Sequence, residues 1–527
     1  MSDTAPATEN RSWLTYMTRY HWYVFTLAAL GWLFDTMDGM IFTASRSITM
    51  ADLMKDSPPD EQRVYGGIVT SLFILGWATG GLIFGVVGDR WGRAKTMALT
   101  IFIYAAFTGL SGLSQNWWQF GILRFLTGLG VGGEFAAGAA LLSEVMPEQA
   151  RAKTLGWLQG LSAVGNITGA VLFWYIEPVW GWKALYLIGA FPALLSVVVR
   201  AGLKEPEKWQ AAKAAAAAAP ATGQSNQMGG IGQLFGAQLR RNTMVGLCLG
   251  ISGVLGLWGA GFFSPELMDA SIPILSAEAR PKFEAIASAK TPEEQLAAIG
   301  KLTEDKDKKI MEVSTYKEIV SRRFTATMSI NPDAALTTPL SAEQSAQLRI
   351  LIDKSMPKNE HTSLKAKGLV LQQIGAFFGI MCYAALAARM GRRPAFLAAF
   401  VIAWFSVVYT FLFFDKPSQV WYMYPLLGFG TLAPFGGYAL YFPELFPTRL
   451  RTTGTGFCYN VGRYVSSIGP FALPVFAAKL HGTTSFAGFR MAAVVISMAY
   501  IIGIVALIWA PETKDQPLPE DEKSFVH

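Results

Sequence analysis

Charged residues are scarce in this chain. They make up 15% of its 527 residues, whereas hydrophobic residues make up 52%. An average soluble protein carries about a quarter charged residues, so the composition excludes an ordinary soluble domain. The charges are gathered in short segments between long apolar stretches, and each stretch reaches the roughly 20 residues that a helix needs to cross a bilayer. The sequence therefore predicts an integral, multi-pass membrane protein.

Residues that support catalysis or metal binding are also few. The three cysteines, Cys248, Cys382 and Cys458, all fall inside apolar stretches and form neither a disulfide framework nor a metal-ligand cluster. The four histidines lie at or beyond the expected helix ends, which excludes a histidine proton relay inside the membrane. No Gly-Lys-Ser/Thr phosphate-binding loop occurs, so ATP has no visible binding site. We expect no enzyme activity, no catalytic residues, no metal and no cofactor.

The apolar stretches predict an all-α membrane protein with twelve transmembrane helices. The first six are expected at 22–46, 64–88, 95–114, 118–145, 154–178 and 182–203, and the second six at 242–268, 366–387, 394–414, 419–445, 453–479 and 485–510. Lys and Arg concentrate in the short loops on one side, and this bias places both termini in the cytoplasm. The net charge of +7 then reflects these loops, and nucleic acid is not expected as a partner.

These helices and loops divide the chain into seven segments. We expect a cytoplasmic tail at 1–21, a six-helix bundle at 22–203, a cytoplasmic central loop at 204–241, helix seven at 242–268, an extracytoplasmic insert at 269–365, the rest of the second bundle at 366–510, and a cytoplasmic tail at 511–527.

The two halves of the chain repeat one another. Gly92-Arg93 recurs as Gly391-Arg392, and Glu144, Pro147 and Arg151 recur as Glu444, Pro447 and Arg451, while Pro206-Glu207 recurs as Pro511-Glu512. Such matched offsets predict two parallel six-helix repeats. Parallel repeats place a solute site between the halves, near the middle of the membrane.

Two motifs carry a family resemblance. Residues 85–95 read Gly-Val-Val-Gly-Asp-Arg-Trp-Gly-Arg-Ala-Lys, which resembles the signature loop of the major facilitator superfamily. Residues 124–134 resemble the fourth-helix motif of the same superfamily. Within it the chain resembles the metabolite–proton symporters for sialate, lactate and related carboxylates, through residues 31–38, 132–134, 442–449 and 456–460. The resemblance implies a transporter fold of two six-helix bundles, here with a helical insert.

Four charges inside the expected spans are candidates for proton coupling: Asp35, Asp38, Glu134 and Arg124. An ionisable side chain at the centre of a spanning helix costs roughly 2.5–3.5 kcal/mol, so it usually faces a cavity or a partner. Asp35 and Asp38 share one helix face, and their mutual repulsion favours proton uptake by one of them. Alternatively, one of the two pairs structurally with a neighbouring helix. Glu134 either titrates or pairs with an arginine. The resemblance links Arg124 to proton coupling, and the alternative is an arginine that reaches the outer membrane interface.

Arg463 is the candidate for binding an organic anion, because a guanidinium offers a planar fork that matches a carboxylate. The alternative is a structural ion pair with Asp35 or Glu134. Five polar residues are expected to line the same cavity: Asn460, Tyr459, Gln159, Gln372 and Gln373.

Six charged residues at helix ends are candidates for gating: Asp89, Arg93, Glu144, Arg392, Glu444 and Arg451. They lie too far from the middle of the membrane to meet a solute there. The resemblance implies a charge cluster that closes the cytoplasmic side, and the alternative is a solvated topology signal.

The insert is expected to form small helices, beginning near Thr291 and Ser341, each of which is followed three residues later by Glu or Gln. For the whole chain we expect proton-coupled symport of a small organic anion, with a neutral sugar or polyol, an organic cation, or a receptor without transport activity as alternatives. The partners would then be a small-molecule substrate, protons and the lipid of a plasma membrane, with a bacterial inner membrane favoured.

Overall fold

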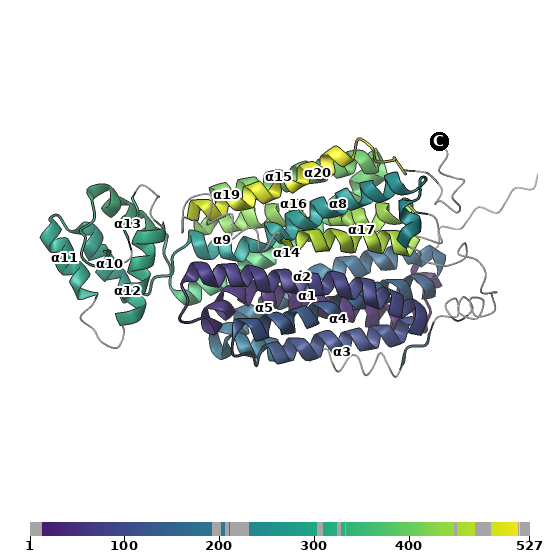
Figure 1. Ribbon diagram of the computed structural model, residues 1–527, viewed down its shortest axis with the longest axis horizontal. Coiled ribbons are helices and arrows are strands. Elements are labelled where there is room, and N and C mark those ends of the chain that lie inside the picture. Colours follow the sequence, from purple (N-terminus) through teal and green to yellow (C-terminus); the bar gives the residue numbers. More distant parts are fainter. Residues whose placement is uncertain are drawn as a thin grey trace, which may run out of the picture.

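The computed structural model describes residues 13–191, 202–205, 210, 231–302, 309–323, 328–331, 334–446, 451–468, 486–514 and 516. These residues form helices, and the parallel pairing of Ile274 with Met356 is the β-type contact among them. Seven helical stretches among them are long and apolar enough to cross a membrane. Figure 1 shows a bundle of long helices side by side, with a small helical body beyond one end.

The first half of the chain supplies five helices of the bundle. They are α1 (Arg19–Leu53), α2 (Pro59–Trp91), α3 (Arg93–Ser111), α4 (Trp117–Val145) and α5 (Glu148–Ile188). Two spans were expected where α5 runs, and Gly181 separates them, because its positive φ of 72° breaks the helical backbone. Thr18 begins α1 by accepting a hydrogen bond from the His21 backbone N–H at 3.2 Å.

The second half supplies the remaining bundle helices. They are α8 (Arg240–Gly259), α9 (Ser264–Ser271), α14 (Lys358–Met390), α15 (Arg392–Phe413), α16 (Val420–Glu444), α17 (Arg451–Ser466), α19 (Phe486–Ser497) and α20 (Ala499–Ala506). The helix expected from 366 begins eight residues earlier, at Lys358, after Pro357. Pro fits the start of a helix because the first N–H groups there have no partner within the helix.

Glycines let the central helices of each half touch through their backbones. A Cβ on Gly80 of α2 would overlap the carbonyl oxygen of Leu129 in α4, and one on Gly379 of α14 would overlap that of Phe429 in α16. Only a residue without a side chain permits these crossings. The same contact therefore occurs in both halves, at positions 299 and 300 residues apart.

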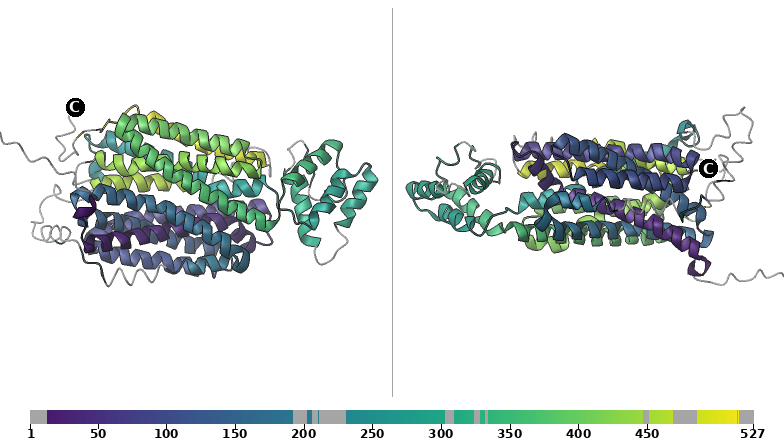
Figure 2. Two further views of the ribbon diagram at one scale, coloured as in Figure 1. Left: turned by 180° about the vertical axis from the view of Figure 1, so that it is seen from behind. Right: turned by 90° about the horizontal axis from the view of Figure 1, so that it is seen from below.

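The insert forms a separate helical body with its own apolar core. Its helices are α10 (Ala279–Ser288), α11 (Pro292–Lys301), α12 (Lys309–Glu318) and α13 (Ala342–Lys354). The expected helix starts are confirmed, since Thr291 and Ser341 each form a reciprocal capping box. Figure 2 shows this body beyond one end of the bundle, here called the insert end. The opposite end, where α1 begins and α20 ends, is called the terminal end.

Candidate functional site

Asp38 and Arg124 form an ion pair inside the first half. Arg124, in α4, lies 3.2 Å from the Asp38 carboxylate, and neither side chain is more than 1% exposed. Thr108 donates a hydrogen bond to Asp38 at 2.9 Å, and Arg124 donates to the Ser111 hydroxyl at 2.8 Å. The structure thus joins two of the four residues expected to couple protons. The Asp38 charge is compensated by that of Arg124.

Asp35 and Glu134 form a second buried pair, in which both side chains are acids. Both side chains are buried, and their carboxyl groups lie within hydrogen-bonding reach of one another. Among the described residues, none donates a hydrogen bond to any of the four carboxyl oxygens. Two buried carboxylates without donors are unfavourable. A proton held between them would remove one negative charge and supply the missing hydrogen bond.

Arg463 projects from α17 into the contact between the two halves. Its guanidinium carbon lies 4.5 Å from the ring centre of Trp77 in α2 and 3.9 Å from that of Tyr459. Its Nη1 donates to the Asn460 side-chain oxygen at 2.9 Å. The side chain is buried, and among the described residues no carboxylate lies within 4 Å of it. The alternative of an ion pair with Asp35 or Glu134 is therefore wrong.

Aromatic rings of both halves pack at this guanidinium, Trp77 from the first half and Tyr459 from the second. Trp77 packs edge-on against Trp258 of α8, with 5.5 Å between ring centres. Trp258 also contacts Phe73 at 6.3 Å and Phe262 at 4.2 Å. Arginine on aromatic faces is held by cation–π attraction, which leaves its N–H edge available to a second ligand. The geometry suits a ligand that has a carboxylate and a flat apolar part.

The two candidate glutamines already have protein partners. Gln372 accepts a hydrogen bond from the Ser264 hydroxyl at 2.7 Å, within the second half. Gln373 accepts one from Asn166 of α5 at 2.9 Å, and this bond joins the halves. The side chain of Gln159 lies outside the described residues. Of the expected lining residues, Asn460 and Tyr459 are the ones that lie against Arg463.

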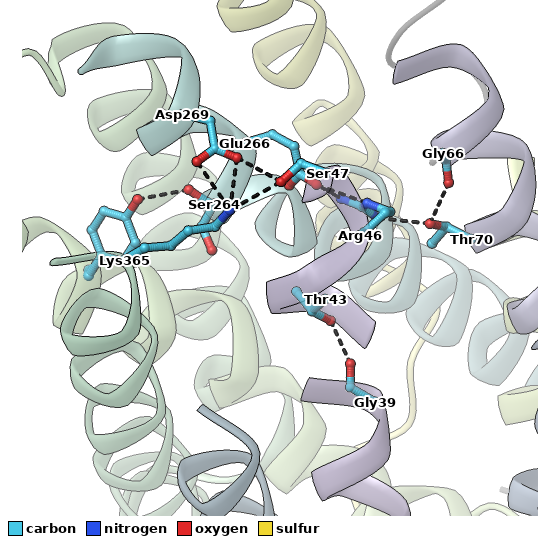
Figure 3. Close-up of polar contacts among 11 residues, drawn as sticks. Gly39, Thr43, Arg46, Ser47, Gly66, Thr70, Ser264, Glu266, Asp269 and Lys365 are labelled. Atoms are coloured by element: carbon cyan, nitrogen blue, oxygen red, sulfur yellow. Dashed lines mark hydrogen bonds and ion pairs between the residues drawn. The ribbon is translucent and has the colours of Figure 1, made fainter. Parts of the chain in front are cut away.

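A group of charged residues joins the two halves at the insert end. Figure 3 shows Arg46 of α1 reaching across to Glu266 of α9. The Arg46 Nε donates to the Glu266 carboxylate at 2.9 Å, Nη1 donates to Thr70 at 2.8 Å, and the guanidinium lies 4.3 Å from the Phe263 ring centre. Both side chains are buried. A buried ion pair with such hydrogen bonds resists separation, because removing one partner leaves an uncompensated charge.

A second ion pair lies beside the first. Lys365 of α14 is 2.8 Å from the Asp269 carboxylate, which also accepts a hydrogen bond from Ser47 of α1 at 2.9 Å. His361 lies near the same carboxylate, with 3.9 Å from its Nδ1. Arg46, Ser47, Glu266, Asp269 and Lys365 are here called the latch.

The expected gating residues at the terminal end are only partly described. Arg392 and Glu444 form an ion pair at 2.8 Å within the second half. The backbone N–H of Arg93 donates to Glu205 at 2.7 Å, just as that of Arg392 donates to Glu512 at 2.8 Å. The side chains of Asp89, Glu144 and Arg451 lie outside the described residues.

These caps revise one detail of the expected repeat. The sequence pairs Glu207 with Glu512, but the carboxylate that caps α3 as Glu512 caps α15 is Glu205. Each cap follows a glycine with positive φ, Gly92 at 126° and Gly391 at 99°. The glycine and the acid are 113 residues apart in the first half and 121 in the second, so the same contact is made across different spacings.

Sequence reasoning missed most of the latch. Arg46 is recognisable as a charge near the end of a span, but the expected insert boundaries hide Asp269 and Lys365 in what reads as a solvated segment. The available signal is the spacing: Glu266 and Asp269 are three residues apart, and His361 and Lys365 are four apart. Such spacings put each pair on one helix face.

Among the described residues, the polar contacts between the halves lie at the insert end and in the middle of the bundle. Besides the latch and the Asn166–Gln373 bond, the hydroxyls of Thr79 in α2 and Tyr464 in α17 are 2.8 Å apart. Lys358 lies 3.9 Å from Glu177 at the insert end. The described contacts thus join the halves at the insert end and in the middle of the bundle.

Known proteins resemble both halves of the chain. Residues 18–279 match the family described as Major Facilitator Superfamily, and residues 371–525 match that described as Sugar (and other) transporter. The cis,cis-muconate transport protein of Acinetobacter baylyi is 25% identical over 94% of this chain and 95% of its own length. The sialic acid transporter NanX of Escherichia coli is 34% identical over 34% of this chain and 46% of its own length.

A solved structure shares the fold along most of the chain. It is a bacterial homologue of the human lysosomal transporter Spinster, in an inward-facing and occupied conformation. It aligns with a TM-score of 0.57 and 13% identity, covering 93% of this chain and 97% of its own.

Proposed function

This chain belongs to the major facilitator superfamily, and from that premise we propose that it carries a small organic carboxylate across a bacterial inner membrane together with protons. It is a multi-pass membrane transporter and not an enzyme.

The proposed architecture is twelve spanning helices in two parallel repeats. Glycine contacts at matched positions support it, since Gly76, Gly80 and Gly128 have counterparts at Gly375, Gly379 and Gly428. The two acidic caps on α3 and α15 support it as well. In this arrangement the insert end faces outward and the terminal end faces the cytoplasm, as the basic loops predict.

The proposed solute site is carried by one observation, the buried guanidinium of Arg463, which has no carboxylate partner in the described part of the chain. A buried charge is unfavourable unless a ligand or partner compensates it. A carboxylate that binds the N–H edge of Arg463 would supply that compensation through paired hydrogen bonds. The rings of Trp77, Tyr459 and Trp258 would cover the apolar part of the solute. The two relatives are named for muconate and sialic acid, which are carboxylic acids.

The other solute classes fit this site less well. A sugar or polyol needs side-chain amides or hydroxyls to bind its hydroxyl groups, and Gln372 and Gln373 are already engaged with Ser264 and Asn166. An organic cation would require an uncompensated acid and a neutralised Arg463, but Asp38 is paired with Arg124, and no carboxylate of the described residues neutralises Arg463. The observations therefore favour an organic anion.

The proposed proton carrier is the pair Asp35 and Glu134. These carboxyl groups are buried, adjacent and without donors among the described residues. They lie on α1 and α4, inside the first half, whereas Arg463 lies in the second. The solute would thus bind in the second half and the proton in the first. Both would then favour the same movement of one half against the other.

Alternating access would open the two ends in turn. The latch fastens the insert end, so this structure corresponds to the state closed on the outside. The proposed gating residues at the terminal end, Asp89, Arg93, Glu144, Arg392, Glu444 and Arg451, would close the cytoplasmic side in the other state.

The binding proposal is tested by ligand-induced thermal stabilisation of the purified protein, using a panel of small carboxylates. A ligand at 100 times its Kd stabilises the folded state by about 2.7 kcal/mol. We expect stabilisation by at least one carboxylate, and its loss in both Arg463→Gln and Arg463→Lys, since an ammonium cannot reproduce the planar fork. Arg389→Gln, at an exposed arginine of the terminal end, is the matched control and should keep it. Stabilisation that persists in Arg463→Gln would return Arg463 to a structural role.

A further inference from the structure

The insert is fastened to the bundle by two paired chain segments. Leu275 donates its backbone N–H to the carbonyl of Met356 at 3.0 Å, and Met356 donates to that of Pro273 at 3.1 Å. Arg280 braces the same junction by donating to the Ile352 carbonyl at 2.8 Å. The insert therefore leaves and re-enters the bundle through one short, hydrogen-bonded junction. Residues 272–357 are called the outer domain below.

This junction connects directly to the latch. Helix α9, which carries Glu266 and Asp269, ends at Ser271, just before the junction. Helix α14, which carries Lys365, begins at Lys358, just after it. The two chain segments that the junction pairs are thus continuous with the two helices whose charges meet in the Asp269–Lys365 ion pair.

The outer domain has the internal contacts of a rigid body. Phe283 and Tyr316 pack edge-on in its core with 5.7 Å between ring centres. The buried Gln295 side chain donates to the Ile286 carbonyl at 3.1 Å and to the Ser345 hydroxyl at 3.0 Å, and it accepts from the Leu340 N–H at 2.6 Å. A body packed in this way holds its two ends at a fixed separation, and those ends are the starts of the junction segments.

The fold itself does not need a domain at this position. In the first half, the matching helices α1 and α2 are joined by the five residues Met54–Pro58. A short turn would serve equally well between α9 and α14. The outer domain therefore has another role. Its position next to α9 and α14 indicates that this role is to control the latch.

We propose that the outer domain is a clamp that sets the outer gate: by holding α9 and α14 together, it keeps Asp269 and Glu266 aligned with Lys365 of α14 and with Arg46 and Ser47 of α1. While the domain is folded, the latch charges compensate one another and the outer side stays closed. Loss of the clamp lets α9 shift, so that the halves separate at the insert end more often. This inference goes beyond the proposed solute and its coupling.

The test uses a cysteine that becomes accessible only when the latch opens. Thr43 is buried on α1, three residues inward of Arg46 and on the same helix face. Thr43→Cys is made in a chain whose three native cysteines are replaced by Ala. Its reaction with a membrane-impermeant maleimide is followed in right-side-out vesicles. Labelling needs no solute, so its outcome is independent of the carboxylate proposal.

Four chains are compared: the reporter alone, Lys365→Met, replacement of residues 274–356 by a flexible Gly-Ser linker, and both changes together. We expect labelling to rise about tenfold in each single variant, a shift of about 1.4 kcal/mol in the gate equilibrium. The combined variant should label no faster than Lys365→Met, because both changes act on one contact. A fifth chain is the control: Lys55→Met, at an exposed lysine just after the end of α1 and outside the latch, should label like the reporter.

A point substitution provides a second route that keeps the chain nearly intact. Phe283→Ala removes a ring from the core of the outer domain, and limited proteolysis at the insert measures how far the domain opens. We expect protease sensitivity and faster labelling together. Unchanged labelling in a chain whose outer domain is protease-sensitive overturns the clamp. The clamp is also overturned if the combined variant labels faster than either single variant, by the product of their two increases.

Discussion

At the scale of single residues, the acids inside the membrane fall into two groups. Asp38 has a full set of partners in Arg124 and Thr108, whereas Asp35 has another acid, Glu134, beside it. Asp35 and Asp38 look equivalent in the sequence, since they are three residues apart on one helix. Their environments separate an ion pair from the acidic pair that we propose as the proton carrier.

Asp35→Asn should uncouple transport from protons while leaving the solute site intact. The amide cannot release a proton, but it is nearly the same size as the carboxyl group, and Arg463 lies in the other half. We expect ligand-induced thermal stabilisation to be kept, accumulation driven by a pH gradient to fall at least about tenfold, and exchange of labelled for unlabelled solute to survive. Loss of binding together with accumulation would contradict the assignment, and Glu134→Gln should give the same pattern.

Asp38→Asn should instead destabilise the protein. It leaves the fully buried Arg124 charge without its counter-ion, and breaking such a pair costs about 3–5 kcal/mol. The measurement is thermal unfolding in detergent. Adding Arg124→Gln should recover a part of the loss, because the double variant has no uncompensated charge. A stable Asp38→Asn protein that fails only in proton-driven accumulation would move the proton carrier to Asp38.

At the scale of helices, close glycine crossings hold each half together. Gly80→Ala places a methyl group on the carbonyl oxygen of Leu129, and the two helices must move apart. Overpacking of this kind costs about 1–3 kcal/mol, and we expect thermal unfolding to report it. Gly85→Ala, on the same helix with nothing within 4 Å of the added atom, is the matched control. Equal stability of the two variants would show that the crossing tolerates separation.

The acidic cap of α15 gives a pH-dependent prediction. Burial alone would raise the pKa of the Glu512 carboxyl, but hydrogen bonds from backbone N–H groups, those of Arg392 and Arg393 first, outweigh burial and hold this pKa below its ordinary value. A carboxyl whose pKa is lower in the folded state contributes its stability above the unfolded pKa, about 4.3 for Glu. That contribution is lost as the pH falls through the folded pKa.

Glu512→Gln should therefore lower stability by about 1 kcal/mol at pH 7. The difference from the unsubstituted protein should shrink as the pH falls below about 4, because protonated Glu512 then resembles Gln. Thermal unfolding at several pH values measures this difference. Glu284→Gln, at an exposed surface pair of the insert, should show no deficit at either pH. A Glu512→Gln deficit that is constant across this range would contradict the role of the charge.

At the scale of the whole molecule, the long helices are readable from the sequence, but most contacts between helices are not. Long apolar runs indicate which segments lie in the membrane, and glycine positions indicate where helices cross closely. Both signals depend on local composition. The pairing of Asp38 with Arg124 joins residues 86 apart, and that of Arg46 with Glu266 joins residues 220 apart. Sequence spacing constrains neither pair, since both depend on how the helices pack.

The insert also shows that local signals can be read from the sequence, whereas burial by distant partners cannot. Its capping boxes at Thr291 and Ser341 are local signals, and both are confirmed. The start of α14 at Lys358 was missed because His361 and Lys365 read as a solvated segment. In the folded protein these polar residues are buried against Asp269, which compensates the charge of Lys365. Hydropathy alone cannot recognise a helix whose charges are neutralised by distant partners.

The proposed function is joint movement of a carboxylate bound at Arg463 and of protons carried by Asp35 and Glu134. Its most direct test is solute accumulation in proteoliposomes, with and without an imposed pH gradient, for a panel of small carboxylates that are each paired with the neutral amide. We expect at least one acid to accumulate only under the gradient, its amide not to accumulate, and Arg463→Gln to abolish the signal. Accumulation of an amide or of a cation, or accumulation of the acid to the same level without the gradient, would contradict it.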